Sequence, residues 1–348
     1  MKGRAWFGRR VIKTGVAVFV TASICHLMDL PVMFAVITAI VTTEPTAADS
    51  LKKGVIRLPA AALGALFAIS LNFCIGQSAL TYALVAMLTI TTCSKLRLDT
   101  GTLVATLTAV AMIPGTTDHV ITDFITRMSG TSVGIIVSTL VNFIVLPPKF
   151  GPILVGKVDK LFHQAGSSLQ LATDHLLCDS EGERTHYYRK LHEQLTNTYQ
   201  LTQFQYDEWR YRKSTEFERR SFGFLQKKLD YLHLFLFHIG KLCHLRMNQS
   251  ISPQEYKAVM GAVNSFKTII NDPYHQMDSS HYVQIEELKL IKENHATNQP
   301  VLYQLCSELL SLHTAASELA LITTDERRFS IQEQAYPDYV FSKKLQYD

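Results

Sequence analysis

The chain has 348 residues, a net charge of +4 and 47% hydrophobic residues, and its charges are unevenly distributed. Residues 1–150 carry 12 basic and 6 acidic side chains, whereas the rest of the chain carries 22 and 24. This distribution excludes the uniformly basic surface of a nucleic-acid-binding protein. The six cysteines lack zinc-type spacing, and no phosphate-binding loop, nucleophile elbow or zinc-protease motif occurs, so we expect no enzyme, metal, cofactor or ATP site.

Six apolar segments fill the first 148 residues, which we interpret as a membrane domain. A bilayer-spanning helix needs about 20 apolar residues. The segments are Val11–Leu30, Pro31–Thr43, Val55–Gly76, Ser78–Cys93, Gly101–Pro114 and Met128–Leu146. The second and fifth are too short to span alone. Their ends should lie inside protein, because unpaired backbone groups facing lipid are too costly.

Basic residues mark alternate loops of this domain. The N-terminus and the loops at Lys52–Arg57 and Lys95–Arg97 carry Lys and Arg, whereas the first and third turns carry none. Lys and Arg favour the cytoplasmic side of a membrane. The pattern therefore predicts six spans in the cell membrane, with both chain termini in the cytoplasm.

The membrane half matches itself at an offset of 70 residues. The matches include several chemical types: Asp29/Asp99, Thr38/Thr108, Arg57/Arg127, Gly64/Gly134 and Asn72/Asn142. Each copy, about 10–76 and 80–146, holds three spans, so the second copy must run inverted. Inverted repeats are typical of transporters, and paired short segments point to the substrate site where the repeats meet.

Two groups of residues follow from this layout. Helix packing is expected at the small-residue pairs Ala60/Gly64 and Gly130/Gly134 and at the amides of Asn72 and Asn142. An anion path would need cations, and Arg57 and Arg127 are symmetry mates near opposite membrane faces. The alternative for both is that they reach lipid headgroups.

Further path candidates lie at the ends of the short segments. They are Glu44, Thr42, Thr43, Thr106, Thr108, Asp29 and Asp99. As alternatives, the threonines would bond to their own helices, and the aspartates would cap helices or, for Asp99, pair with nearby cations.

The sequence AIVTTEPT at Ala39–Thr46, followed by Ser50-Leu-Lys-Lys-Gly-x-x-Arg57, resembles the signature loop of the aromatic acid exporter family. That family lies in the fusaric-acid-resistance-like superfamily and is distantly similar to the plant aluminium-activated malate channels. The resemblance implies six N-terminal spans, a cytoplasmic helical domain and efflux of aromatic carboxylates. Glu44 departs from the Gln that relatives often carry. The family's R-x-x-G-T-x-x-G pattern is intact at Arg127–Gly134 and degraded at Arg57–Gly64.

The second half of the chain is predicted to be a cytoplasmic antiparallel helical bundle over residues 149–330, with a tail at 331–348. Helices are expected near 152–178, 183–211, 214–247, 252–271, 280–294 and 299–323. The clearest start signal is Ser252-Pro253-Gln254-Glu255, a capping box with proline at the first helical position.

The sequence as a whole therefore predicts an all-α membrane exporter of aromatic carboxylates or other small organic anions. We expect a homo-oligomer, because six spans with two short segments make a thin wall around a pore. An anion channel of the same architecture and a membrane-anchored scaffold without transport are the alternatives.

Overall fold

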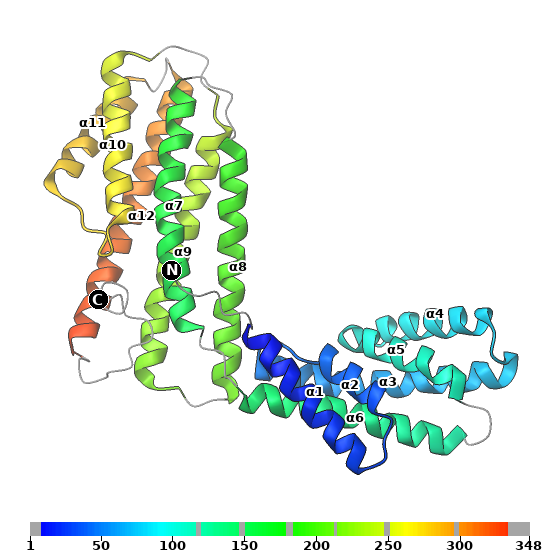
Figure 1. The fold of residues 1–348 in the computed structure, drawn as a ribbon. Helices are drawn as coiled ribbons and strands as arrows, with labels where there is room; N and C mark the ends of the chain where they lie inside the picture. Colours follow the sequence, from blue (N-terminus) through cyan, green and yellow to red (C-terminus); the bar gives the residue numbers. More distant parts are fainter. Residues whose placement is uncertain are drawn as a thin grey trace. The chain divides into compact units, whose positions relative to one another are not determined.

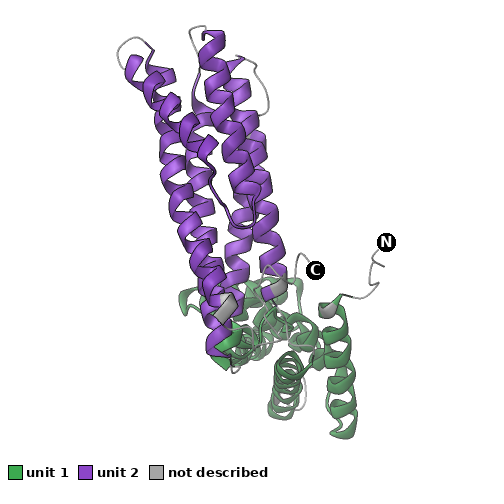
Figure 2. Ribbon diagram, turned by 90° about the vertical axis from the view of Figure 1, so that its left-hand side faces the viewer, with its two compact units in different colours: residues 1–148, 206–212 green, residues 149–205, 213–348 purple. Residues whose placement is uncertain are grey.

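The computed structural model describes residues 8–115, 120–145, 150–178, 184–211, 214–246, 251–295 and 299–332, and these contain helices and loops but no strand. The predicted all-α class is therefore confirmed for the described residues (Figure 1). The chain forms two compact units (Figure 2). Unit 1 holds residues 1–148 and 206–212, and unit 2 holds residues 149–205 and 213–348.

Unit 1 is built from six α-helices and two short 3-10 turns in its described part. The α-helices are α1 Arg9–Leu27, α2 Val32–Val41, α3 Ala47–Ile75, α4 Ala79–Lys95, α5 Thr102–Met112 and α6 Val120–Ile144. The 3-10 turns are η1 Asp99–Gly101 and η2 Ile113–Gly115. The two shortest α-helices, α2 and α5, correspond to the two segments that were predicted to be too short to span a bilayer.

Helix α3 begins earlier than the sequence predicted. We expected a loop through Lys52, Lys53 and Arg57, but the helix starts at Ala47. The hydroxyl of Thr46 accepts a hydrogen bond from the backbone N–H of Asp49, which caps the first turn. The two lysines and Arg57 are therefore helical residues, and Arg57 lies three turns inside α3. Helix α6 likewise begins at Val120, ahead of the expected Met128.

Small residues let α3 approach α5 and let α6 approach α2. A Cβ added at Gly64 would lie 2.5 Å from the carbonyl oxygen of Ala105. A Cβ at Gly134 would run into the carbonyl oxygen of Ala35. Both contacting pairs are related by the same offset of 70 residues. The small-residue patterns thus mark sites where a long helix lies directly on the backbone of a short one.

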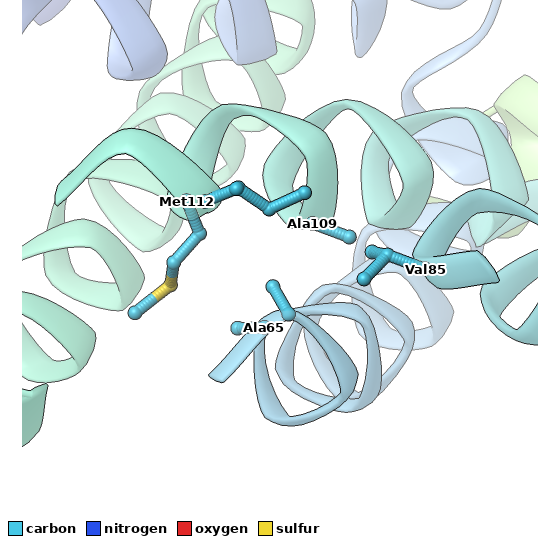
Figure 3. Close-up of a cluster of buried hydrophobic side chains, with 6 residues drawn as sticks. Ala65, Val85, Ala109 and Met112 are labelled. Carbon is cyan, nitrogen blue, oxygen red and sulfur yellow. The ribbon is translucent and has the colours of Figure 1, made fainter. Parts of the chain in front are cut away.

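An apolar cluster fixes the far half of α3 against α4 and α5. Its buried members are Ala65, Ala68, Val85, Ala109, Met112 and Ile113. Figure 3 shows side chains from the three helices pointing toward one another, with Met112 filling the space beside Ala65. Alanines dominate on α3, so the helices approach closely and the larger side chains come from α4 and α5.

Unit 2 consists of long helices that run side by side (Figure 1). They are α7 Gly151–Leu177, α8 Arg184–Tyr211, α9 Glu216–His244, α10 Pro253–Asn271, α11 Ser279–Asn294 and α12 Pro300–Gln332, with the end of α8 belonging to unit 1. The predicted capping box at Ser252 and Glu255 is confirmed, and Thr215 with Glu218 forms a second one. The core of this unit is formed by buried Leu, Ile and Phe side chains, among them Phe222, Phe235 and Phe266.

Four described helices are long and apolar enough to cross a membrane: Arg10–Leu27, Ala47–Ile75, Ile121–Ile144 and Pro300–Phe329. Val32–Val41 and Ala79–Lys95 are shorter apolar helices. The last of the four is α12, which the sequence analysis placed in the bundle. Two of its carboxylates, Glu308 and Glu326, are almost buried and pair with Lys241 and Lys228 of α9. This packing against α9 favours the bundle assignment over a span.

We predict that Gly64→Ala destabilises unit 1 by about 1–3 kcal/mol, because the new methyl group meets backbone that cannot rotate away. Thermal unfolding of the purified protein in detergent would measure the loss. Gly15→Ala in α1 is the matched control, since no atom lies within 4 Å of its added Cβ. Equal unfolding temperatures for the two variants would contradict the close approach.

A histidine pair is buried between α10, α11 and α12. The Nε2 atom of His281 lies 3.1 Å from Nδ1 of His313, and its Nδ1 atom lies 2.8 Å from the hydroxyl of Ser265. Burial, together with the charge of His313, lowers the pKa of His281 to about 4, although Asp278 acts in the opposite direction. The folded bundle therefore resists protonation at a position where an unfolded chain would accept a proton.

We predict that the bundle loses stability as pH falls from about 6.5 to about 4. Over this range the unfolded chain binds a proton at His281 and the folded chain does not, so unfolding is favoured. Amide hydrogen exchange of peptides from α10 to α12, compared with a His281→Gln variant at each pH, would measure the effect. An identical pH dependence in the variant would show that another group is responsible.

Candidate functional site

A buried ion pair joins the α2–α3 turn to the interior of α3. The guanidinium of Arg57, 5% exposed, donates from Nη2 to Glu44 at 2.5 Å and from Nε to the carbonyl of Thr100 at 3.3 Å. Its Nη1 atom lies 3.5 Å from the carbonyl of Thr42, a long hydrogen bond. Lys53 donates to the other oxygen of Glu44 at 3.0 Å. Every nitrogen of Arg57 therefore faces a protein acceptor.

The same turn is held from α6 by an asparagine. The amide nitrogen of Asn142, which is fully buried, donates to the carbonyls of Glu44 and Thr46 at 3.0 and 2.8 Å and to the hydroxyl of Ser50 at 2.7 Å. The ammonium of Lys13 donates to the amide oxygen at 2.7 Å. Because a cation can only face the oxygen, Lys13 fixes the orientation in which the amide serves the turn.

Arg127, the symmetry mate of Arg57, is held differently. Its Nη1 atom donates to the carbonyl of Ala111 at 2.6 Å, near the end of α5. The guanidinium carbon also lies 4.4 Å from the centroid of the Phe34 ring on α2. A guanidinium has five N–H donors, and the others make no hydrogen bond to a described residue. Arg127 therefore retains donors that a ligand could use.

A groove between α2 and α5 lies beside Arg127. It encloses about 160 Å³ and is lined by Met33, Phe34, Ile37, Thr38, Val41, Val104, Leu107, Thr108 and Ala111. Phe34 and Ala111 are the two residues that Arg127 contacts, so the guanidinium lies at the edge of this groove. The lining is apolar apart from two threonine hydroxyls, which is the usual composition of a small-molecule site.

The two threonines of the groove differ from their neighbours. The hydroxyls of Thr42, Thr43 and Thr106 bond to carbonyls one turn earlier in their own helices. The hydroxyls of Thr38 and Thr108 make no hydrogen bond within the part of the chain that the structure describes. The two are symmetry mates at the offset of 70, so the repeats present one available hydroxyl each.

The remaining predicted residues lie apart from the groove. Asp29 is exposed and adopts a left-handed backbone conformation (φ 52°) after the end of α1, and Asp99 is exposed at the start of η1. Neither caps α2 or α5 through its side chain. Asn72 donates to the carbonyl of Ile113 at 3.4 Å. These side chains bracket unit 1 and do not converge on one site.

Packing also assigns roles to the other small residues. Gly101, at the entry to α5, leaves room for Ala60, whose Cβ would lie 2.6 Å from a Cβ built on that glycine. The backbone of Gly130 faces Pro31 at the entry to α2. Each long helix thus contacts the start of the opposite short helix. Among the described residues no cluster of metal-ligating side chains occurs.

Sequence reasoning missed three contributors to these sites. Lys13 was read as a topology marker, yet it is 5% exposed and hydrogen-bonded to Asn142. Thr38 entered only as a repeat match, and Phe34 was not considered. Thr38 could have been found from its mate Thr108, which was already a candidate. Phe34 carries no comparable signal, because apolar residues occur throughout the segment.

Comparison with known proteins places this architecture. Residues 5–145 match the family described as Aromatic acid exporter family member 1. A UPF0421 protein of Halalkalibacterium halodurans is 52% identical over 98% of this chain and 96% of its own. UPF0421 proteins of Bacillus cereus and Staphylococcus haemolyticus are 40% and 36% identical over 92% and 86% of this chain and 95% and 93% of theirs. The resemblance carried by the segment from Ala39 to Arg57 is thereby confirmed, and the chain belongs to the aromatic acid exporter family, a family of multi-pass membrane transporters.

Proposed function

We propose that the protein exports small aromatic carboxylates and that the groove between α2 and α5 is the substrate site. The observation that carries the proposal is a cation beside an apolar slot. Arg127 lies at the edge of a groove whose hydroxyls, those of Thr38 and Thr108, have no described protein partner. An aromatic ring fits the apolar lining, and its carboxylate fits the guanidinium.

The size of the groove favours a substrate with one ring. An apolar protein cavity of about 150 Å³ holds a single benzene molecule, and this groove encloses about 160 Å³. The threonine hydroxyls would serve ring substituents or the second carboxylate oxygen. Arg127 would hold the charge, because a guanidinium binds a carboxylate through two parallel hydrogen bonds.

The two arginines then have different tasks along one anion path. Arg57 is saturated by Glu44 and two carbonyls, so an anion would reach it only after Glu44 lets go. A proton on Glu44 would remove that negative charge and release the guanidinium. We therefore propose that Glu44 is a proton-sensitive latch on the path, with Arg57 exposed to the substrate when the latch is open.

The layout of six spans in two inverted repeats is part of this proposal. Contacts of Gly64 with Ala105 and of Gly134 with Ala35 support it, since each pair follows from the other by the offset of 70. Both termini and the bundle would lie in the cytoplasm of a cell-membrane protein, as the basic loops indicate.

A second copy of the chain is proposed to cover the groove. Helices α2 and α5 have 10 and 11 residues, or about 15 Å each at 1.5 Å per residue, half of a hydrocarbon core of about 30 Å. Their ends cannot face lipid. Large apolar side chains along them, among them Met33 and Leu103, are exposed in the single chain. A homo-oligomer would bury this face and close the path.

We predict that Arg127→Gln reduces flux of benzoate-type acids in proteoliposomes at least tenfold without loss of inserted protein, because the substrate loses its counter-charge. Arg127→Lys should retain part of the activity, since it keeps the charge but not the paired donors. Undiminished flux in Arg127→Gln would overturn the role of this arginine. Flux that follows the anion's own electrochemical gradient would identify a channel in place of an exporter.

A steric variant tests the groove itself. Ile37→Trp would fill it, whereas Ile90→Trp places the same ring on an exposed position of α4 outside the groove. Flux should fall in the first variant and persist in the second. Loss of flux in both would point to general damage to the membrane half, and flux retained in both would place the path elsewhere.

For the latch, we predict that Glu44→Gln makes export nearly independent of pH between 6 and 8, because the side chain can no longer gain or lose a proton. Flux at several pH values, with the membrane potential clamped, would measure this. Asp49→Asn is the matched control, since Asp49 also contacts Lys53, at 3.7 Å, but does not touch Arg57. An unchanged pH profile in Glu44→Gln would contradict the latch.

A further inference from the structure

A second groove lies within unit 2, where α9 packs beside α8 and α12. It has a volume of about 460 Å³, within the range of about 300–1,000 Å³ that is typical of ligand sites. The side chains that shape it are those of Tyr188, Phe237, Lys241, His244 and Gln304, around the backbone of Gly240. The groove thus combines two aromatic rings with two basic side chains.

A glycine sets the position of one ring. A Cβ added at Gly240 would lie 2.7 Å from Cζ and 2.8 Å from the hydroxyl of Tyr188. The phenol therefore lies against the backbone of α9, where any side chain would displace it. This close contact forms an aromatic wall on one side of the groove.

A lysine supplies the charge beside the second ring. The ammonium of Lys241 lies 4.6 Å from the centroid of the Phe237 ring and donates to Glu308 at 3.0 Å. The other oxygen of Glu308 lies 2.6 Å from Nδ1 of His238. Glu308 is 7% exposed, while the side chain of Lys241 is 41% exposed. The carboxylate is therefore shared and buried, and the ammonium reaches the groove with N–H donors to spare.

Several polar groups of this groove await a partner. The hydroxyl of Tyr188, the imidazole of His244 and the amide of Gln304 make no hydrogen bond to any residue that the structure describes. Phe237 is 52% exposed, although it is a large apolar side chain. An aromatic anion would match all of these features, because its ring would cover Phe237 and Tyr188 and its carboxylate would meet Lys241 and His244.

We propose that this groove is a regulatory binding site for aromatic carboxylates, through which unit 2 senses their concentration. At about 460 Å³ it is nearly three times the volume of the groove between α2 and α5. It therefore accepts larger members of the class, such as those with two fused rings. The site is defined by its own residues and does not depend on transport by unit 1.

The test is equilibrium binding of 1-naphthoate to the full-length protein, measured by calorimetry in detergent. We expect one binding event that Lys241→Gln weakens at least tenfold, because a charge-assisted hydrogen bond is lost. Phe237→Leu should also weaken it, and this exposed position carries little risk of unfolding. Lys257→Gln, at an exposed lysine of α10 outside the groove, is the matched control and should bind normally.

The outcomes separate this inference from the proposed export function. Binding that Lys241→Gln and Phe237→Leu weaken and Arg127→Gln leaves intact supports a site in unit 2, even if no flux is observed. Binding that only Arg127→Gln abolishes, or no binding of naphthoate or benzoate to a protein that transports benzoate, overturns the regulatory site and leaves the export proposal standing.

Discussion

The turn between α2 and α3 is the constraint on which unit 1 depends. Its backbone leaves helical geometry at a depth where water would not reach it in a membrane, so its carbonyls need partners from the protein. Arg57 serves the carbonyl of Thr42, and Asn142 serves those of Glu44 and Thr46. A long helix on each side therefore donates to the turn, and the break in the chain becomes a junction between α3 and α6.

This junction explains why a groove exists between the short helices. Helix α2 is held by α1 and α6, and α5 is held by α3 and α4. Each short helix is in backbone contact with a long helix of the other half, at Gly134 and Gly64. Because α2 and α5 are anchored to different long helices, only a few side chains fill the space between them, and a ligand-sized gap remains.

The sequence carried most of this architecture because its strongest signals are local. Apolar segments place the helices of unit 1, and the offset of 70 residues pairs the positions that later prove to pack. Helix starts were less predictable. Lys52 and Lys53 read as a loop because charged residues seldom enter a span, and the capping hydroxyl of Thr46, which lets the helix begin at Ala47, was not recognised.

The site itself was only partly predictable, for a physical reason. Arg57, Arg127 and Thr108 are rare residue types in apolar segments, so composition singled them out. Which of them is available to a ligand depends on partners that lie far away in sequence. Arg57 is occupied by Glu44 and by the carbonyl of Thr100, 43 residues away. Periodicity cannot show such pairing, and Phe34 in the groove wall has no distinguishing signal at all.

One residue breaks the symmetry of the repeats, and it decides how the two arginines differ. At the offset of 70, Glu44 corresponds to Pro114, which has no charge. Arg57 is therefore neutralised within its own repeat, whereas Arg127 has only a carbonyl and an aromatic ring as close contacts. A transporter with two equivalent arginines would bind its anion equally at both ends. A carboxylate at one end alone makes the two ends unequal, and it ties that difference to a group that can take up a proton.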